Sequence, residues 1–364
     1  MKIHGKSYRT IWVAADQWSI EVIDQTKLPF EFSTRVLSTV DEAADAIVSM
    51  VVRGAPLIGA TAAYGLCLAL KVDPSNASLD RAYERLLTTR PTAINLKWAL
   101  DEMVLAVRGV PIEQRSAIAY ARAAKLCDDD VTTNAAIGRY GLTLIEAMAL
   151  RKHGRSVNIL THCNAGWLAC VDWGTALAPI YMAYDKGVPL HVWVDETRPR
   201  NQGGSLTAYE LGAHGVPHTI IVDNAGGHYM QRGLVDLCIV GTDRTTAVGD
   251  VANKIGTYLK ALAAFDNDVP FYVALPSSTI DWSISDGLKE IEIEERSGRE
   301  VTHIMGRTAE GALVEVEITA PRSEAANPAF DVTPARLVAG LITERGIVAA
   351  TQEGLASCFP ERSR

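Results

Sequence analysis

Long apolar runs and targeting signals are missing from this chain of 364 residues. The longest uncharged apolar stretch, residues 54–70, is shorter than the ~20 residues that span a membrane, and it contains Thr61 and Tyr64. The lysines near the N-terminus, Lys2 and Lys6, are not followed by the apolar segment of a secretory signal. We therefore expect a cytoplasmic protein that has no membrane partner.

Motifs for metals, nucleotides and disulfides are missing as well. Six cysteines in so long a chain do not form a disulfide framework, and CxxC, HExxH, P-loop and GxGxxG patterns are absent. His214 and His218 have the spacing of two metal ligands on a helix, but Gly215 and Pro217 between them break a helix. We expect reduced thiols and no metal, and a dinucleotide site has little support.

Positive charge is in deficit, with 35 Lys and Arg against 43 Asp and Glu, which gives a formal net charge of −8. Because the acidic excess is spread along the chain, we expect no nucleic-acid partner. The net charge does not exclude a local basic pocket that binds a small anion. Aromatic residues are few, at 7%, but 48% of the residues are hydrophobic. A chain of this length buries roughly three quarters of its surface on folding, which is enough for a large core.

Two domains are predicted from the length and from a change in hydrophobic periodicity near residue 150. At ~150 residues per domain, the chain corresponds to about two domains. Residues 11–13 and 20–22 alternate as short strands do, and helical spacing follows from residue 41 to about residue 150. These patterns predict a small sheet plus a helical layer at residues 1–150.

Beyond the basic stretch 151–155, short apolar runs alternate with helix-compatible segments. The runs are rich in β-branched residues and lie at 157–161, 190–194, 218–222, 235–240 and 271–274. Apolar strands joined by helices are typical of a parallel sheet that is covered on both faces. The sequence therefore predicts an α/β protein whose second domain, residues 151–364, is a doubly wound parallel sheet.

Polar side chains stand at the ends of the predicted strands, where parallel sheets bind ligands. They are His162, Cys163, Asp195, Glu196, Asp223 and Asp243. Cys163 lies in a strand-to-helix turn, where a helix N-terminus lowers the pKa of a thiol, or it is simply a small buried residue in a tight turn. Asp243 is either a functional carboxyl or a helix cap or a partner of Arg244. Position alone leaves these alternatives open.

Two further segments have the character of anion-binding sites. In residues 53–56, Arg-Gly-Ala-Pro, the glycine allows close backbone approach and the guanidinium can bind phosphate through two N–H groups. Asn253 and Lys254 are predicted at the start of a helix, whose N-terminal amides favour an anion. The alternatives are a surface turn between two helices in the first case and a solvated lysine in the second.

Six sequence blocks resemble the methylthioribose-1-phosphate isomerase family and follow its order along the chain. They are residues 51–59, 90–96, 161–166, 195–199, 202–203 and 249–258, and they span nearly the whole length. The resemblance implies an N-terminal sheet-and-helix domain, a Rossmann-like C-terminal domain, a homodimer, a sugar-phosphate substrate in methionine salvage and no cofactor. It also implies a catalytic pair, Cys163 and Asp243. The substrate-binding residues that it implies are Arg53, Gly54, Ala55, Arg90, Gln202, Asn253 and Lys254.

The reaction that the resemblance implies converts 5-methylthioribose 1-phosphate into 5-methylthioribulose 1-phosphate, an aldose-to-ketose isomerisation. The sugar ring must open without loss of the phosphate, and Asp243 is expected to protonate the ring oxygen from a neutral carboxyl in apolar surroundings. Hydrogen then moves from C2 to C1. Cys163 either shuttles a proton through an enediol-type intermediate or stabilises a direct hydride shift, and the sequence does not decide between them.

The sequence departs from this family close to the predicted site, at Trp167, Asp172, Trp173 and Arg200. Trp167 is predicted to form an apolar wall for the methylthio group, the alternative being a packing role, whereas an inward Arg200 would favour a second phosphate. The alternative substrates are therefore 5-deoxyribose 1-phosphate and ribose 1,5-bisphosphate. A further alternative is a non-catalytic regulatory subunit of the translation-initiation guanine-nucleotide exchange factor, because such subunits share the fold.

Overall fold

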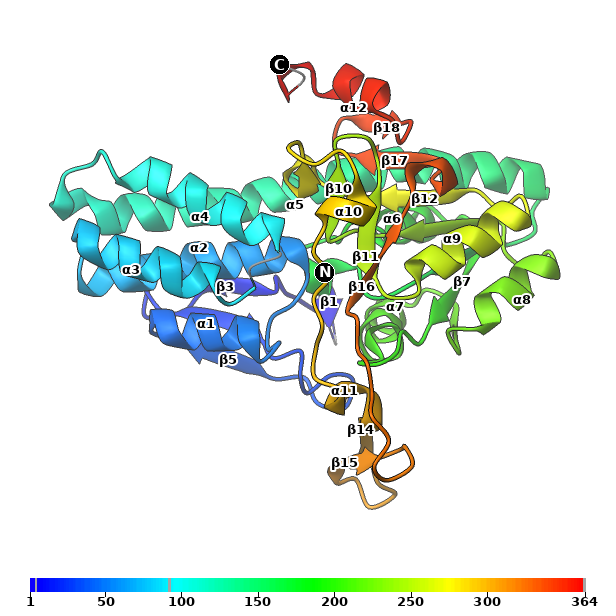
Figure 1. Cartoon of the computed structure of the whole chain (residues 1–364), viewed down its shortest axis with the longest axis horizontal. Coiled ribbons are helices and arrows are strands. Elements are labelled where there is room, and N and C mark those ends of the chain that lie inside the picture. The colour runs from blue at the N-terminus through cyan, green and yellow to red at the C-terminus, as the bar shows by residue number, and fades with distance from the viewer. Residues whose placement is uncertain (4, 91–92, 363–364) are drawn as a thin grey trace.

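The structure, a computed structural model, describes residues 1–3, 5–90 and 93–362. Pro91 and Thr92, which belong to the quoted blocks, lie outside the described residues. In the described part, helices and small sheets from the first 152 residues lie beside a large sheet built by the rest of the chain (Figure 1).

Two small antiparallel sheets and a layer of helices make up the N-terminal part. Its strands are β1 (Lys2–Ile3), β2 (Lys6–Ser7), β3 (Ile11–Val13), β4 (Ile20–Ile23) and β5 (Thr34–Leu37). Its helices are α1 (Val40–Val48), α2 (Ala55–Val72), α3 (Asn76–Leu87), α4 (Ile94–Val107) and α5 (Ile112–Lys152). β1 pairs with β2, and β3, β4 and β5 form a three-stranded sheet. The predicted small sheet and helical layer are confirmed.

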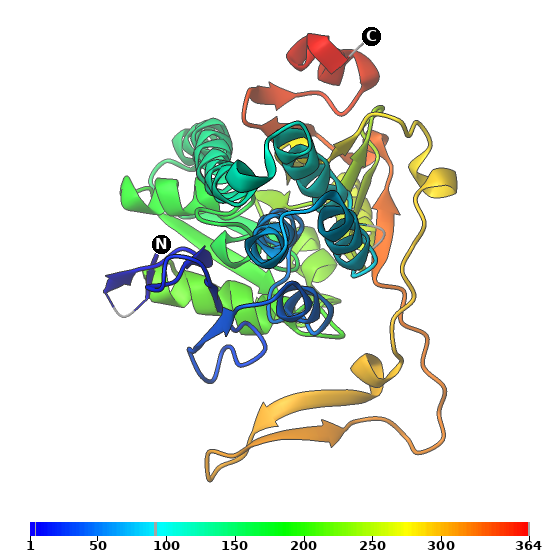
Figure 2. The same cartoon turned by 90° about the vertical axis from the view of Figure 1, so that its left-hand side faces the viewer.

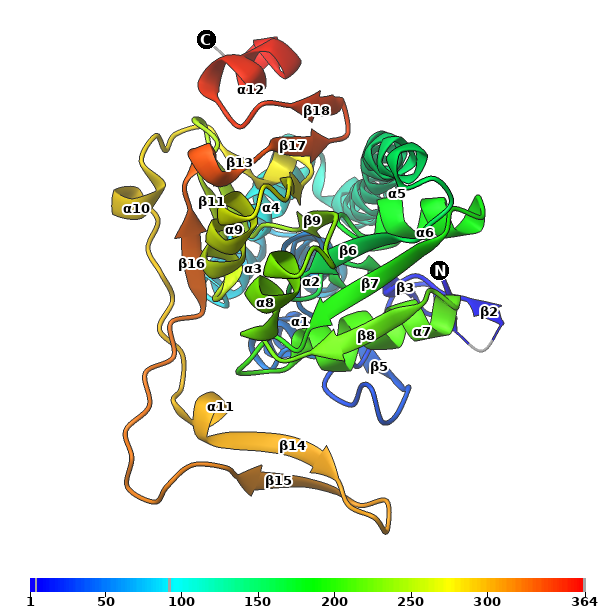
Figure 3. The ribbon, with the colours of Figure 1, turned by 90° about the vertical axis from the view of Figure 1, so that its right-hand side faces the viewer.

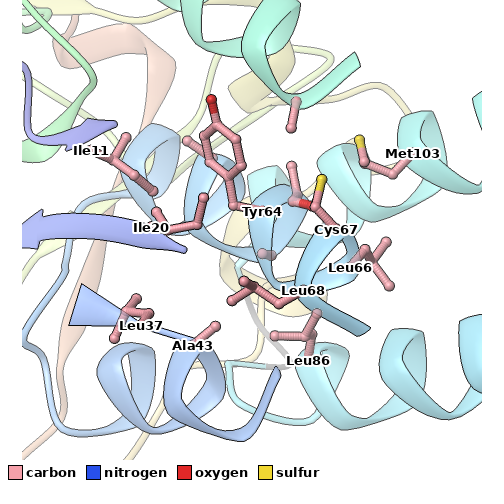
Figure 4. Close-up of a cluster of buried hydrophobic side chains, with 14 of the residues drawn as sticks. Ile11, Ile20, Leu37, Ala43, Tyr64, Leu66, Cys67, Leu68, Leu86 and Met103 are labelled. Carbon is pink, nitrogen blue, oxygen red and sulfur yellow. The ribbon is translucent and has the colours of Figure 1, made fainter. Parts of the chain in front are cut away.

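Helix α2 is the centre of the N-terminal core (Figure 4). It packs against α1, α3, α4 and α5, and successive side chains such as Leu66, Cys67 and Leu68 are all buried. By length and composition this helix could cross a membrane, but 83% of its 18-residue window is buried within the structure. A helix that is apolar all round is typical of a core, and each large buried side chain contributes about 1.5–3 kcal/mol. The core thereby fixes the start of α2, next to residues 53–56.

A seven-stranded sheet forms the centre of the second part, in the order β18-β17-β12-β9-β6-β7-β8. β18 is antiparallel to β17, and the other neighbours are parallel. The strands are β6 (Val157–Thr161), β7 (Leu190–Asp195), β8 (His218–Ile221), β9 (Leu237–Val240), β12 (Phe271–Ala274), β17 (Gly340–Thr343) and β18 (Gly346–Val348). The first five coincide with the predicted apolar runs to within two residues, which confirms them. The sequence analysis did not predict the last two.

Helices cover both faces of this sheet (Figure 3). Those of the second part are α6 (Ala178–Asp185), α7 (Ala208–His214), α8 (Ala225–Gln231) and α9 (Thr257–Asp266). Along β9, Leu237 and Ile239 belong to the core formed with α5 and α6, whereas Cys238 and Val240 belong to the core formed with α9. Alternate side chains of a strand point to opposite faces, so both faces are buried, as predicted.

A second sheet and a projecting hairpin have no counterpart in the prediction. The second sheet has four strands, β13 (Ile280–Asp281), β10 (Arg244–Thr246), β11 (Val251–Lys254) and β16 (Phe330–Thr333). The hairpin of β14 (His303–Arg307) and β15 (Leu313–Glu317) projects from the body on two extended connections (Figure 2). Two short helices, α10 (Gly287–Glu290) and α11 (Arg299–Thr302), lie between β13 and β14, and α12 (Gln352–Cys358) follows β18.

Asn253 and Lys254 lie in strand β11, so the predicted helix start at these two residues is wrong. The backbone of β11 pairs with β10 on one side and with β16 on the other. Gly256 then turns the chain with a φ of 101°, and α9 begins at Thr257. A strand that forms through pairing with distant segments leaves little signal in the local sequence.

The change from the helical part to the large sheet occurs at residues 153–156. Helix α5 runs for 41 residues and ends where His153 and Gly154 adopt positive φ angles of 50° and 86°. The domain boundary at residue 150 stays a prediction.

Gly141→Ala tests the contact between α5 and α6, which joins the two parts. A methyl group at Gly141 would overlap the ring of Pro179 in α6. We expect a loss of about 1–2 kcal/mol of unfolding free energy in urea, because the steric cost exceeds the gain in helix propensity. Gly109→Ala is the control, since no described atom beyond its own residue and its two chain neighbours lies within 4 Å of the Cβ that it adds. A Gly141→Ala variant as stable as the wild type would contradict this packing.

Candidate active site

One pocket brings together residues from both parts of the chain. It encloses about 640 Å³ of empty space, part of which is open to solvent. All nine predicted site residues line it, namely Arg53, Gly54, Ala55, Arg90, Cys163, Gln202, Asp243, Asn253 and Lys254. The pocket therefore lies at the start of α2 and beyond the carboxyl ends of β6 and β9.

The start of α2 supplies backbone amides and a guanidinium to the pocket. Gly54 precedes the helix with a φ of 91°, and a Cβ at this position would lie 2.6 Å from Ala169. Glycine is therefore required, and because it has no side chain it cannot cap the first N–H groups of the helix. Arg53 donates hydrogen bonds through both terminal nitrogens to the side-chain and main-chain oxygens of Asn164. Residues 53–56 face the pocket and are not a surface turn.

Cys163 lies in a tight turn after β6, with a φ of 64°. Its backbone N–H donates to Thr197 Oγ1 at 2.8 Å, and its Sγ donates to Gln202 Oε1 at 3.0 Å. The turn leads into a short 3-10 helix at Trp167–Ala169 and not into an α-helix. Burial raises the pKa of the Cys163 thiol, and the nearby cations oppose this only in part. Of the two alternatives, the structure therefore favours a buried residue in a tight turn over activation by an α-helix N-terminus.

Glu210, a buried carboxylate on α7, holds the turn that carries Cys163. It accepts four hydrogen bonds, from Asn164 Nδ2 at 2.9 Å, Trp167 N at 2.8 Å, Leu168 N at 3.0 Å and Tyr181 Oη at 2.8 Å. Asn164 in turn accepts from Arg53, so hydrogen bonds connect α7 to the start of α2. Sequence analysis missed Glu210, because an acidic residue on a helix is usually solvated.

A second buried network lies behind the pocket, around Asp195. Asp195 Oδ2 lies 2.9 Å from His162 Nδ1 and 3.2 Å from Lys260 Nζ. Asp223 accepts a hydrogen bond of 2.7 Å from the backbone N–H of Thr197. Ligand atoms of His162, Asp195 and Asp223 lie within 4.8 Å of one another, a spacing that could hold a metal ion. Lys260 already supplies positive charge to Asp195, so we interpret the network as a support for the turn at Thr197.

Three cationic side chains gather on the side of the pocket that contains Phe330. Lys254 Nζ lies 4.5 Å from the centre of the Phe330 ring and donates to a backbone carbonyl at 2.8 Å. The guanidinium of Arg296 lies 5.7 Å from the same ring. Arg90 and Arg296 share the carboxylate of Glu294, at 3.5 Å and 2.8 Å. Burial and then the charge of Arg296 lower the pKa of Lys254 to about 8.

Asp243 follows β9, and its half-buried side chain lies among these cations. Its charge acts on both Arg90 and Lys254. The surroundings are therefore cationic and not apolar, which corrects the expectation for this residue. The element after Asp243 is strand β10, so the helix-cap alternative is wrong. The guanidinium of Arg244 forms an ion pair with the carboxylate of Asp281, with an N–O distance of 3.5 Å.

The four departures from the family lie outside the pocket lining, as far as the described residues show. Trp167 is 1% exposed and packs into the core of the second part, so the predicted wall is wrong and the packing alternative is confirmed. Trp173 packs against the same core. Arg200 binds Glu300 at 2.8 Å, and Asp172 binds the N-terminal amine at 2.7 Å. Apolar lining comes instead from Met50, Ala165, Ala169 and Phe330.

The sequence and the fold are those of a known family of proteins. The chain belongs to the initiation factor 2 subunit family, whose model matches residues 51–350. The methylthioribose-1-phosphate isomerase of Paramagnetospirillum magneticum is 66% identical over 363 residues, with 100% of each chain covered. The enzyme of the same name from Methylorubrum populi is 63% identical over 364 residues, again with 100% of each covered. Because the chain is 66% and 63% identical to these isomerases over its whole length, it is an enzyme of the isomerase class.

Two solved structures are similar over nearly the whole chain. The 5-methylthioribose 1-phosphate isomerase of Pyrococcus horikoshii OT3 has a TM-score of 0.83 and 40% identity, covering 98% of this chain and 97% of its own. The translation initiation factor eIF-2B subunit delta of A. fulgidus has a TM-score of 0.80 and 37% identity, covering 97% and 100%. The fold is thus shared by proteins named as enzymes and as initiation factors.

Lys254 should make anion binding depend on pH. Because the pKa of the buried ammonium is about 8, its charge is present below that pH and is lost above it. The affinity for sulfate, whose own charge is constant in this range, should fall at least about tenfold between pH 7 and pH 9.5 in calorimetric titrations. Lys254→Arg keeps its charge and should show a flat profile. Equal profiles for the two proteins would contradict this assignment.

Proposed function

We propose that this isomerase converts 5-methylthioribose 1-phosphate into 5-methylthioribulose 1-phosphate, as a step of methionine salvage in the cytoplasm. The observation that carries the proposal is the pocket, in which a thiol, a carboxyl and several cations from distant parts of the sequence meet. The name shared by relatives that are 61% to 66% identical supports the substrate. As the family resemblance implies, we also propose a homodimer that needs no cofactor.

The cationic side of the pocket is the proposed phosphate site. The proposed site combines Arg90 and Lys254 of that side with Arg53 and the uncapped N-terminus of α2, which line the same pocket. A helix N-terminus and charged N–H donors are the groups that bind phosphate in proteins. Burial of these cations costs free energy of desolvation, and a bound anion would offset that cost. This supports placing the phosphate here.

Asp243 is the acid of the ring-opening step in this proposal. A proton moves from its carboxyl to the ring oxygen while the bond between C1 and that oxygen breaks, and the phosphate stays on C1. Asp243 lines the pocket beside the cations that are proposed to hold the phosphate, so the acid would lie close to C1.

The raised pKa of the Cys163 thiol favours a direct hydride shift over a proton shuttle. In this route a hydride moves with its electron pair from C2 to C1, and the C2 hydroxyl becomes a carbonyl. The hydroxyl proton goes to Asp243, which regenerates the acid. A proton shuttle would need a thiolate, whereas burial raises the pKa of the Cys163 thiol. The polarizable sulfur would instead stabilise the charge that develops at C1.

The methylthio group is proposed to lie toward Met50. This residue, together with Arg53 and Gln202, lines both the pocket and a larger groove beyond it. A thioether suits such a surface, because methionine is apolar and polarizable. Arg200 lies in the groove but is bound to Glu300, which disfavours a second phosphate. Apolar residues of the groove include Pro29, Phe30, Pro199, Leu206 and Met305.

Cys163→Ala and Asp243→Asn test the catalytic pair. We expect each to lower kcat at least about 100-fold, which is the low end of a lost acid–base contribution. Cys358→Ala and Asp266→Asn are the controls and should keep the wild-type kcat, because neither residue is among those that line the pocket. A near-wild-type kcat for either catalytic variant would refute the role proposed for that residue.

Turnover of the isolated protein in D2O tests the substrate and the route together. Proton NMR would follow 5-methylthioribose 1-phosphate, 5-deoxyribose 1-phosphate and ribose 1,5-bisphosphate. We expect the first two to react with the higher kcat/KM, and C1 of the product to carry little deuterium. Substantial deuterium at C1 would contradict the hydride shift, and a preference for the bisphosphate would overturn the substrate. No turnover of any sugar would favour the non-catalytic alternative.

A further inference from the structure

Arg296 reaches the pocket from a connection outside the main sheets. Residues 291–298 and 324–329, here called the strap, link the four-stranded sheet to the β14–β15 hairpin (Figures 2 and 3). The two segments bond to each other, with the backbone N–H of Arg296 donating across at 3.0 Å and that of Ala329 donating to Glu294 O at 2.8 Å. The backbone of Arg296 is thereby fixed beside the pocket.

The guanidinium of Arg296 is buried, since its side chain is only 8% exposed. Nε and Nη2 donate to the two carboxylate oxygens of Glu294 at 2.8 Å and 3.3 Å. Nη1 lies 3.9 Å from Met50 Sδ. A thioether is a weak acceptor, and a guanidinium has five N–H groups, so Arg296 keeps donor capacity at the pocket wall.

The charges around the pocket do not balance among the described residues. The positive side chains are Arg53, Arg90, Lys254 and Arg296. Asp243 and Glu294 supply at most two negative charges. In addition, the buried Nε of Arg90 has no hydrogen-bond partner among the described residues. A phosphate monoester, with about −1.5 to −2 charges near neutral pH, would supply both the missing charge and the missing acceptors.

We propose that Arg296 is a further substrate-binding cation, which contacts the phosphate together with Arg90 and Lys254, while Glu294 holds both arginines in place. This inference rests on the proposed function in so far as the ligand is a sugar phosphate. Arg296 lies outside the sequence blocks that carry the family resemblance, and it adds a contact from the strap to the substrate site.

A merely structural Arg296 would do no more than pair with the carboxylate of Glu294 within the strap. Arg296→Met keeps much of the side-chain length and removes the charge, whereas Arg296→Lys keeps the charge and loses the forked geometry. Arg299→Met is the matched control. Arg299 stands three residues further along the same connection, pairs with Glu315 and is 61% exposed.

The experiment measures the Kd of inorganic phosphate by calorimetry, together with kcat and KM of the isomerase reaction. For Arg296→Met we expect phosphate binding to weaken about 10- to 150-fold and KM to rise with it, while kcat changes less. Arg296→Lys should fall between this variant and the wild type, and Arg299→Met should match the wild type. A phosphate Kd for Arg296→Met within about twofold of the wild type would overturn the inference.

Phosphate affinity separates this inference from the proposed function. If the wild-type protein turns over none of the sugars, the proposed function fails, yet a weakened phosphate Kd in Arg296→Met would still support Arg296 as an anion ligand. Should Arg296→Met not fold, Arg296→Lys carries the test, because it keeps the charge and loses the forked donor geometry. Phosphate binding weaker than in the wild type is expected for this variant, and a phosphate Kd equal to that of the wild type would overturn the inference.

Discussion

Burial of positive charge between the two parts of the chain is the constraint on which the rest of the structure depends. A buried guanidinium or ammonium costs several kcal/mol unless oxygen atoms or a ring surround it. Arg53 donates hydrogen bonds to the oxygens of Asn164, and Arg90 and Arg296 form ion pairs with Glu294. Lys254 lies over the ring of Phe330 and donates to a backbone carbonyl. These partners come from elements that meet only in the folded chain, so the fold and the pocket stabilise each other.

Two buried carboxylates give the chemically important turns their rigidity. Glu210 gathers four donors beneath the turn of Cys163, and Asp195 holds His162 and Lys260 behind it. The positive φ of Cys163 persists because both sides of its turn are bonded in this way. Hydrogen bonds within the protein therefore fix this turn, and fixed groups are what stabilisation of a developing charge requires.

The large sheet could be predicted from the sequence because each strand is a local apolar run, as in residues 157–161. Most pocket residues could be singled out as well, from strand ends and from segments suited to anions, whereas Arg90 and Gln202 came only from the family resemblance. What failed depends on tertiary contacts. Lys254 is in a strand because β16 pairs with it, and Trp167 points into the core because its turn directs it there. Arg296 was missed because an arginine in a charged run is usually solvated.

The central claim is that an anion binds at the start of α2, between the two parts of the chain. A crystal structure of the protein with the ketose phosphate product bound tests it most directly. The account predicts the phosphate within hydrogen-bond distance of the first backbone amides of α2 and of Arg90 and Lys254, with C1 of the sugar between Cys163 and Asp243. A phosphate bound in the groove beyond Met50, with the pocket left to solvent, would contradict it.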